Sequence, residues 1–147
     1  MLAGSLHIIH REEQPIIYIV AALVLDQAGR VLLVRKRGTK AFMQPGGKLK
    51  PAEAPLEALG REMREELTCS FSPSDAAFLG TFTAPVANEE GFLVEAALYR
   101  VQVVGQIRPA AEIEEVLWLD PQPPHSTALA PLTRERVLPL AQTLGGS

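Results

Sequence analysis

Residues 46–69 read GGKLKPAEAPLEALGREMREELTC. A Gly-Gly turn comes first, and a segment with helical spacing follows it. Pro55 suits the first position of that helix, because its fixed φ is favourable there and its missing N–H is not needed. An apolar stripe then recurs every three or four residues, at Leu56, Leu59, Met63 and Leu67. This spacing predicts a helix from Pro55 onward that packs one face against a core.

A second face of the predicted helix carries three glutamates. Glu62, Glu65 and Glu66 are spaced i,i+3 and i,i+4, so their carboxylates are neighbours. Like charges placed in this way destabilise a helix by roughly 0.2–0.5 kcal/mol per pair, which Arg61 and Arg64 offset only in part. Mg²⁺ or Mn²⁺ would convert the repulsion into coordination, since hard cations take oxygen ligands and are bound together with substrate phosphates.

Two details beside the helix also favour a cation site. Glu53 lies just ahead of the helix, where the helix dipole favours a negative charge. Gly46 and Gly47 allow a backbone to approach a neighbour or a ligand more closely than a residue with a Cβ would. The alternative is an acidic, solvated helix face without a ligand, and these two details disfavour it. A cation bound in this way implies a phosphorylated substrate.

With these residues in view, the stretch from Gly46 to Cys69 resembles the Nudix box, the signature of the Nudix hydrolase family, and matches it at every charged position. Two other stretches are similar to the family. Residues 29–37 resemble the strand that leads to its site, and residues 112–119 resemble its late acidic segment before a Trp-bearing strand. The resemblance implies an α/β fold of the α/β/α sandwich type, with a mixed β-sheet between helices.

The resemblance also implies an activity. The substrate would be a nucleoside diphosphate linked to another moiety, such as a nucleoside triphosphate or ADP-ribose, and water would attack phosphorus. Divalent ions suit such a reaction, because they activate water, orient phosphates and stabilise charge. By the same resemblance, Arg61 would orient Glu65 and pair with Glu53. The implied ligands of Mg²⁺ or Mn²⁺ are Gly47, Glu62, Glu65 and Glu66.

A general base is needed as well, and the sequence offers several glutamates. Glu66 and Glu62 are the candidates inside the box. Outside it we favour Glu112, which we place on a loop before the last strand, with Glu89 and Glu90 of a predicted hairpin turn as rivals. The alternative for each residue outside the box is a solvated surface position.

Basic and aromatic residues near the Gly-Gly turn are candidates for substrate binding. Arginine binds phosphate as a fork and lysine binds it as a point charge, whereas a phenylalanine could stack on a base. The candidates are Arg35, Arg37, Lys48 and Phe42. Solvated loop positions are the alternative for the basic residues, and a packing role is the alternative for Phe42. Pro85 lies near a proline that marks some ADP-ribose-cleaving members, but its offset is imperfect and the substrate stays open.

The chain departs from the family pattern at three positions in or beside the helix. Thr68 stands where the family usually has glycine, and a β-branched residue meets a steric cost in the left-handed conformation. A different helix end is therefore open. Ala54 stands where a Ser, Thr or Asp cap is expected. Gly60 lies mid-helix, at a cost of about 1 kcal/mol relative to alanine.

Composition predicts one cytoplasmic domain over residues 1–147, with residues 1–14 as an N-terminal extension or an extra strand. No apolar run approaches the ~20 residues that a membrane span needs. A net charge of −3 argues against nucleic-acid binding, so a nucleotide-type small molecule is the expected partner. Cys69 fills the hydrophobic slot that closes the box, which favours a buried structural thiol over a nucleophile. The resemblance leaves a homodimer open.

Outside the box, hydrophobic patterning predicts five strands and a C-terminal helical segment. Residues 16–25 form a buried strand, and residues 30–35 are its hairpin partner. The segment 126–144 has helical spacing that two prolines interrupt. The other predicted strands are 77–85, 92–104 and 116–119. The competing hypothesis for function is a catalytically silent nucleotide-binding or regulatory domain, in which lost box carboxylates would be expected; all three are present.

Overall fold

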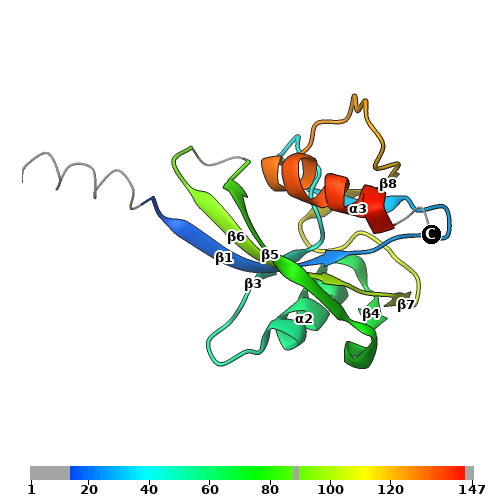
Figure 1. The fold of residues 1–147 in the computed structure, drawn as a ribbon. Coiled ribbons are helices and arrows are strands. Elements are labelled where there is room, and N and C mark those ends of the chain that lie inside the picture. The colour runs from blue at the N-terminus through cyan, green and yellow to red at the C-terminus, as the bar shows by residue number, and fades with distance from the viewer. Residues whose placement is uncertain (1–13, 88–89, 145–147) are drawn as a thin grey trace, which may run out of the picture.

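The computed structural model describes residues 14–87 and 90–144, so the predicted N-terminal extension falls almost wholly outside the described part. A mixed four-stranded sheet lies between two helical layers, which confirms the predicted α/β/α arrangement (Figure 1). The strand order is β3-β1-β6-β5, with β1 parallel to β6 and all other neighbours antiparallel. These strands are β1 (Ile16–Leu23), β3 (Gly46–Lys48), β5 (Ala77–Pro85) and β6 (Leu93–Arg100).

Two smaller ladders complete the strands. In one, β2 (Val31–Lys36) pairs antiparallel with β8 (Ile113–Leu119); in the other, β4 (Ser70–Phe71) pairs with β7 (Val103–Val104). The predicted hairpin between the first two strands is confirmed only beside its turn, where Leu25 and Val31 form an isolated bridge. Beyond the bridge, β2 turns away to β8, so the hairpin prediction was wrong for most of its length.

The alternation of β1 explains why the sheet has a helix on each face. Successive side chains of a strand point to opposite faces. Val20 and Ala22 pack on the side of the box helix, whereas Ala21 and Leu23 pack on the side of the C-terminal helix. All four are buried, and β1 is therefore the strand that joins the two halves of the core.

The box helix is α2 (Pro55–Leu67), and it begins at the predicted proline. The N-cap residue Ala54 makes no side-chain hydrogen bond to the first turn. Instead, the carboxylate of Glu57 within the helix accepts a hydrogen bond from the backbone N–H of Ala54 at 2.9 Å. Its C-terminus ends in the left-handed conformation at Thr68, with φ 56° and ψ 28°. The threonine thus takes the conformation usual for glycine, so a different helix end, which the sequence left open, does not occur.

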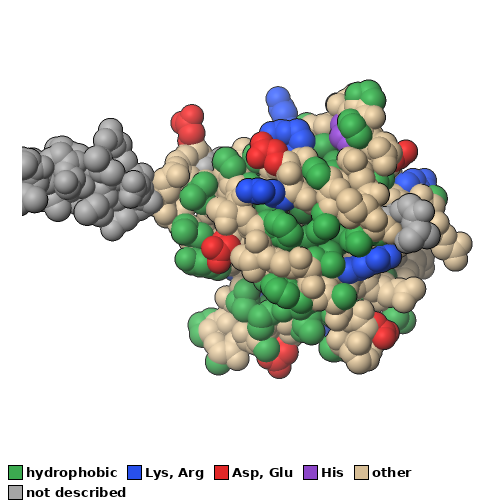
Figure 2. All heavy atoms as spheres, viewed as in Figure 1, with side chains coloured by type: hydrophobic (Ala, Val, Ile, Leu, Met, Phe, Trp, Pro, Cys, Tyr) green, Lys and Arg blue, Asp and Glu red, His purple; other side chains and the backbone are tan. Residues whose placement is uncertain are grey.

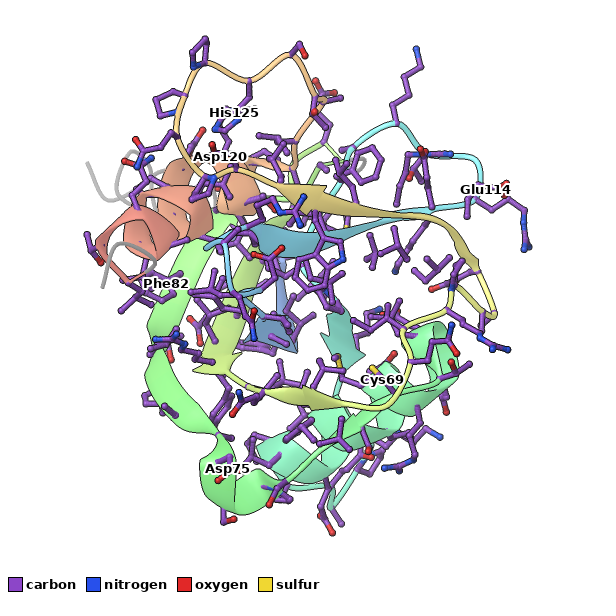
Figure 3. All side chains as sticks on the ribbon, turned by 90° about the vertical axis from the view of Figure 1, so that its right-hand side faces the viewer. Cys69, Asp75, Phe82, Glu114, Asp120 and His125 are labelled. Atoms are coloured by element: carbon purple, nitrogen blue, oxygen red, sulfur yellow. The ribbon has the colours of Figure 1, made fainter. Side chains whose placement is uncertain are left out.

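The C-terminal segment is helical over a shorter range than expected. Helix begins at Pro131 rather than at residue 126, continues as a π-helical stretch, η2 (Thr133–Val137), and ends as α3 (Leu138–Leu144). A short 3₁₀ turn, η1 (Pro73–Asp75), precedes β5. Figure 3, turned by 90°, shows α2 and α3 on opposite sides of the sheet and Cys69 beside α2. Cys69 is buried, as predicted for a structural thiol.

The surface and the helices bear on two predictions about partners. On the face seen in Figure 2, basic and acidic side chains are interspersed and no broad basic area is visible. None of the helices in the described residues has the length and apolar character needed to cross a membrane.

Candidate active site

Arg61 ties the loop before α2 to the helix itself. Its guanidinium binds the carboxylate of Glu53 through two hydrogen bonds, Nε to Oε2 at 2.8 Å and Nη2 to Oε1 at 2.9 Å. The same Nη2 donates to the backbone carbonyl of Lys48 at 3.1 Å. These hydrogen bonds from Arg61 lower the pKa of Glu53 to about 2. The predicted pair of Arg61 and Glu53 is therefore present, and it fixes β3 against the start of α2.

The third guanidinium nitrogen of Arg61 contacts two of the box glutamates. Nη1 lies 3.0 Å from Oε2 of Glu62 and 3.4 Å from Oε1 of Glu65. The side chain of Glu62 is 15% exposed, whereas that of Glu65 is 53% exposed. Arg61 thus holds Glu62 in a partly enclosed position, while Glu65 lies out toward solvent.

Glu66 is the buried carboxylate of the box, with 4% of the residue exposed. The backbone N–H of Gly46 lies 3.4 Å from its Oε1. Burial raises the pKa of Glu66 to about 7, and the neighbouring charge of Glu62 adds to the rise; Gly46 and the ammonium of Lys36 act against it. A carboxyl group in this environment gains strongly from a nearby cation.

The two glycines of β3 let the sheet edge lie directly against these carboxylates. A Cβ at Gly47 would lie 2.5 Å from Oε2 and 2.6 Å from Cδ of Glu62. A Cβ at Gly46, where φ is +149°, would collide with the carbonyl oxygen of Val20 on β1. Gly47 is therefore required for the close approach of the backbone to Glu62, as the sequence predicted for a Gly-Gly turn.

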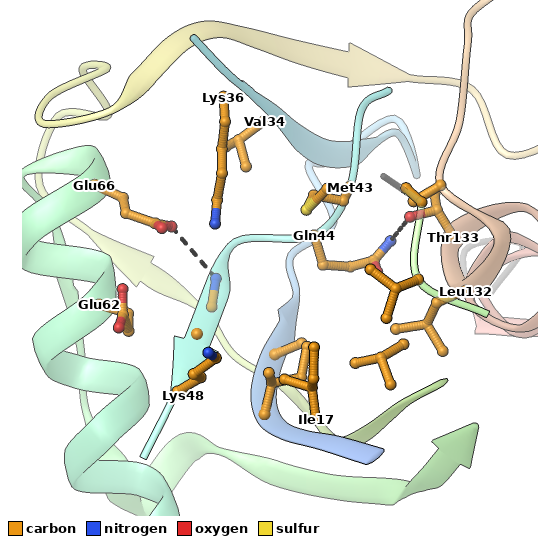
Figure 4. Close-up of a pocket in the computed structure, with 18 of the residues that line it drawn as sticks. Ile17, Val34, Lys36, Met43, Gln44, Lys48, Glu62, Glu66, Leu132 and Thr133 are labelled. Carbon is orange, nitrogen blue, oxygen red and sulfur yellow. Dashed lines mark hydrogen bonds between the residues drawn. The ribbon is translucent and has the colours of Figure 1, made fainter. Parts of the chain in front are cut away.

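A cavity of about 540 Å³ opens where α2, β3, β1 and the C-terminal segment meet (Figure 4). One end is polar and charged, and the other end is lined by apolar side chains of β1, of β6 and of residues 130–132 just before η2. The polar and charged lining residues are Lys36, Gln44, Gly46, Gly47, Lys48, Glu62, Glu66, Glu112 and Thr133. The apolar lining includes Ile17, Ile19, Val94, Leu132 and Pro85.

The cavity brings together some of the predicted site residues from distant parts of the chain. Gly47, Lys48, Glu62 and Glu66 come from the box, and Glu112 comes from the loop before β8. The side chain of Glu112 is 59% exposed and pairs with Lys36 at 3.2 Å. Glu112 therefore lies at the cavity as an accessible carboxylate. Of its two rivals, Glu90 is exposed in a turn and Glu89 falls outside the described residues.

Three predicted substrate-binding residues are not part of the cavity lining. Arg35 pairs with Glu115 at 3.0 Å, and its guanidinium lies 5.9 Å from the centre of the Phe42 ring. Arg37 binds the backbone carbonyl of Ala111 at 3.1 Å. Side chains alternate along a strand, and Lys36, which lies between the two arginines, lines the cavity. A role in substrate binding for Arg35, Arg37 and Phe42 stays a prediction.

Three polar residues that line the cavity were not among the site residues predicted from the sequence: Lys36, Gln44 and Thr133. A signal existed for Gln44, because a polar residue enters the apolar segment Ala41-Phe42-Met43 just before the glycines. None existed for Thr133, since only the fold brings residue 133 beside residue 44.

The donor set at the charged end fits a hard divalent cation. In residues 14–87 and 90–144 no group of three or more His, Cys, Asp or Glu side chains is arranged to hold a metal ion. Mg²⁺, however, is typically bound by one or two carboxylates together with water and substrate phosphates. Glu62 and Glu66 meet that requirement beside Gly47. The wider ligand set that includes Glu65 stays a prediction.

Comparison with known proteins points to one family. The NUDIX domain model matches residues 16–140. An RNA pyrophosphohydrolase of Halorhodospira halophila is 44% identical over 61 residues, which make up 42% of this chain and 33% of that relative. The match thus spans about a third of the relative's length.

Solved structures are similar over most of the chain. The MutT protein of Methanosarcina mazei Go1 superposes with a TM-score of 0.69 at 23% identity, over 92% of this chain and 99% of that one. The E. coli ORF135 protein gives 0.64 at 22% identity, over 90% and 91% of the two chains. At these identities the two structures support the fold alone.

Proposed function

The chain belongs to the NUDIX hydrolase family, and from this premise we propose that it is a metal-dependent pyrophosphohydrolase of nucleoside diphosphate derivatives. The observation that carries the proposal is the pair Glu62 and Glu66 against the Gly-Gly edge of β3, where Glu66 is buried and Glu62 is partly enclosed. Two carboxylates so close together in a partly desolvated site repel each other, and burial alone favours the neutral form of Glu66. A divalent cation would remove both costs.

Each residue at the charged end has a task in this proposal. Glu62 and Glu66, with the backbone carbonyl of Gly47, would hold Mg²⁺ or Mn²⁺. When bound, such an ion supplies charge neutralisation for the phosphates and lowers the pKa of coordinated water. Arg61 keeps Glu62 in place through its 3.0 Å contact, so that the carboxylate does not swing into solvent.

Lysines and a further glutamate complete the charged end. Lys36 and Lys48 line the cavity beside the carboxylates and would bind substrate phosphates as point charges. Glu112 is our candidate for the general base, because it lines the same cavity and its carboxylate is open to water. Glu66 and Glu62 would then be free to hold the ion; they are the rival bases inside the box.

The class of substrate follows from the family, and its identity is left to experiment. Nucleoside triphosphates, ADP-ribose and similar derivatives all place a pyrophosphate beside a nucleoside. The relative from Halorhodospira halophila is named for RNA, so RNA with a terminal pyrophosphate belongs in the same panel.

The proposal is tested by incubating this panel with Mg²⁺ or Mn²⁺ and separating the products by chromatography. We expect hydrolysis that stops when the metal is chelated and that falls by orders of magnitude in Glu66→Gln, while the variant still unfolds cooperatively. Glu114→Gln is the matched control, because Glu114 pairs with Arg37 outside the cavity. Near-normal rates in Glu66→Gln would remove its proposed metal role. Tight nucleotide binding without any turnover would favour the silent nucleotide-binding domain.

A further inference from the structure

Buried polar side chains are rare in this protein, and they converge on one place. Three polar or charged residues are buried in the described part of the chain: Gln44 at 6% exposure, Glu66 at 4% and Thr133 at 0%. All three line the same cavity. Burying a polar group costs free energy unless it is hydrogen-bonded. The proposed hydrolysis explains Glu66, but it does not use Gln44 or Thr133.

Gln44 and Thr133 form a pair at the end of the cavity away from the carboxylates. The side-chain Nε2 of Gln44 donates to Oγ1 of Thr133 at 3.0 Å. Figure 4 shows this contact across the cavity from Glu62 and Glu66, with Leu132 beside it. The two residues are 89 positions apart, so the contact joins the strand edge to the C-terminal helical layer. It holds the amide nitrogen of Gln44 beside Thr133.

The amide keeps unused hydrogen-bonding capacity. A glutamine side chain has two N–H donors and a carbonyl oxygen with two lone pairs. One donor is bound to Thr133, and the structure shows no other hydrogen bond of this side chain within the described residues. Every buried side-chain nitrogen or oxygen in that part of the chain has a hydrogen-bond partner. Because the carbonyl oxygen of Gln44 has none, this atom is not buried, and it is exposed to the cavity that Gln44 lines.

The walls around the amide are apolar. Ile17 and Ile19 of β1 and Val94 of β6 line the cavity from the sheet, and Leu132 lines it from the C-terminal layer. A slot with apolar walls and one fixed donor–acceptor group suits a flat heteroaromatic ring, which needs apolar contact on its faces and hydrogen bonds at its edge.

We propose that Gln44, held in place by Thr133, binds the hydrogen-bonding edge of the substrate's nucleobase and sets which base this enzyme prefers. The inference rests on the proposed function in one respect, which is that the phosphates occupy the Glu62 and Glu66 end. A primary amide pairs with a base edge that carries a donor next to an acceptor, as glutamine does with adenine. Thr133 is a positioning residue, because it acts through Gln44.

The test measures dissociation constants rather than turnover. Methylene-bridged analogues of the four ribonucleoside triphosphates, together with an abasic ribose triphosphate, are titrated calorimetrically into wild type and Gln44→Met. Methionine keeps the length of the side chain and removes the amide. We expect wild type to separate its best and worst bases by about 5- to 150-fold, the range for one bidentate contact. In Gln44→Met the ratio of affinities between the best and the worst base should fall to about twofold, and the affinity for the abasic compound should stay unchanged.

Two further variants keep the result decisive. Thr133→Val removes the hydroxyl at nearly constant shape and should reduce part of the difference in affinity between bases. This variant replaces Gln44→Met if Gln44→Met fails to unfold cooperatively. Gln102→Met is the control, because Gln102 is exposed outside the cavity. The inference is overturned if Gln44→Met keeps the wild-type difference in affinity between bases, or if wild type binds all bases equally. It is also overturned if Gln44→Met loses as much affinity for the abasic compound as for the nucleotides. Since binding is measured without hydrolysis, an enzyme that turns over nothing would refute the proposed function and leave this test intact.

Discussion

Replacing Gly47 with alanine tests how closely the sheet edge and Glu62 must approach. The backbone of Gly47 does not lie in the left-handed region, so an alanine can adopt it without strain of that kind. The new Cβ would nevertheless lie 2.5 Å from Oε2 of Glu62, where ordinary contact begins at 3.4 Å. The carboxylate must therefore move by roughly 1 Å, a displacement that can cost about 10²-fold in rate at a catalytic centre.

The direction of that movement is limited by Arg61. Glu62 is held by Nη1 of Arg61 at 3.0 Å, and the same guanidinium is fixed by two hydrogen bonds to Glu53. The carboxylate can shift only by lengthening or leaving its contact with Arg61, so the proposed metal site is distorted. Stability should change little, because the displaced atoms are the far end of a flexible side chain.

The assay compares Gly47→Ala with Gly60→Ala under saturating Mg²⁺. At Gly60 the nearest atom to a new Cβ is Nη1 of Arg64, at 3.4 Å, so alanine fits. Gly60→Ala should keep full activity and gain about 1 kcal/mol of stability, because glycine is the poorer helix former. Gly47→Ala should lose about 10²-fold in kcat with a melting temperature near that of wild type. Activity within twofold of wild type in Gly47→Ala would show that the site tolerates the displacement of Glu62.

Three other predictions concern stability and the ion pairs of the site. Burial raises the pKa of Glu66 to about 7 in the folded protein, above its usual value of 4.5, so the metal-free protein should lose stability as pH rises from about 4.5 to 7 and then level off. Glu66→Gln should abolish this loss, which amounts to about 3 kcal/mol at 1.36 kcal/mol per pKa unit. The free energy of unfolding is measured in urea at pH 4 to 8, and the same dependence on pH in the two proteins would contradict the prediction. Arg61→Lys should lower kcat at least ~10-fold, because lysine has no fork to bind Glu53 twice and hold Glu62 as well; retention of full activity would show that the fork is dispensable. Thr68→Gly should raise stability by about 1 kcal/mol, measured by thermal unfolding, because Thr68 holds a left-handed φ of 56°; an unchanged or lower melting temperature would mean that its 3.4 Å contact with the carbonyl of Gln106 outweighs the relieved strain.

Local features of the chain were the ones that the sequence could predict. The start of α2 follows from Pro55, and its buried face follows from the spacing of Leu59, Met63 and Leu67. The pair of Arg61 and Glu53 could be expected because both lie within one short segment. Such features depend on neighbours in sequence, which periodicity and charge describe well.

Features that depend on pairing between distant strands could not be read in the same way. Residues 30–35 have the pattern of a hairpin partner, yet β2 forms its ladder with β8, about 80 residues later. Both pairings satisfy the same hydrophobic pattern, because the pattern fixes which face is buried and not which strand lies alongside. The contact of Gln44 with Thr133 was hidden for the same reason, since it requires the C-terminal segment to fold back over β1.

The three box carboxylates differ in exposure, and helix spacing alone could not predict that difference. Spacing of i,i+3 and i,i+4 places Glu62, Glu65 and Glu66 on one side of a helix, but that side is wide enough to span both cavity and solvent. Glu66 is almost fully buried and Glu62 is partly enclosed, whereas Glu65 is half exposed and contacts Arg61. Sequence spacing gives the face of a helix, and only the surrounding elements decide how much of that face is covered.

Glu62 and Glu66 are proposed to hold a divalent ion against the Gly-Gly edge of β3. Anomalous diffraction from crystals soaked in MnCl₂ would locate that ion. We predict one strong peak within roughly 2.2 Å of both carboxylates and of the Gly47 carbonyl oxygen. If the carboxylates stay bound to Arg61 and to the Gly46 N–H, with no peak between them at saturating Mn²⁺, then Glu62 and Glu66 do not form a metal site.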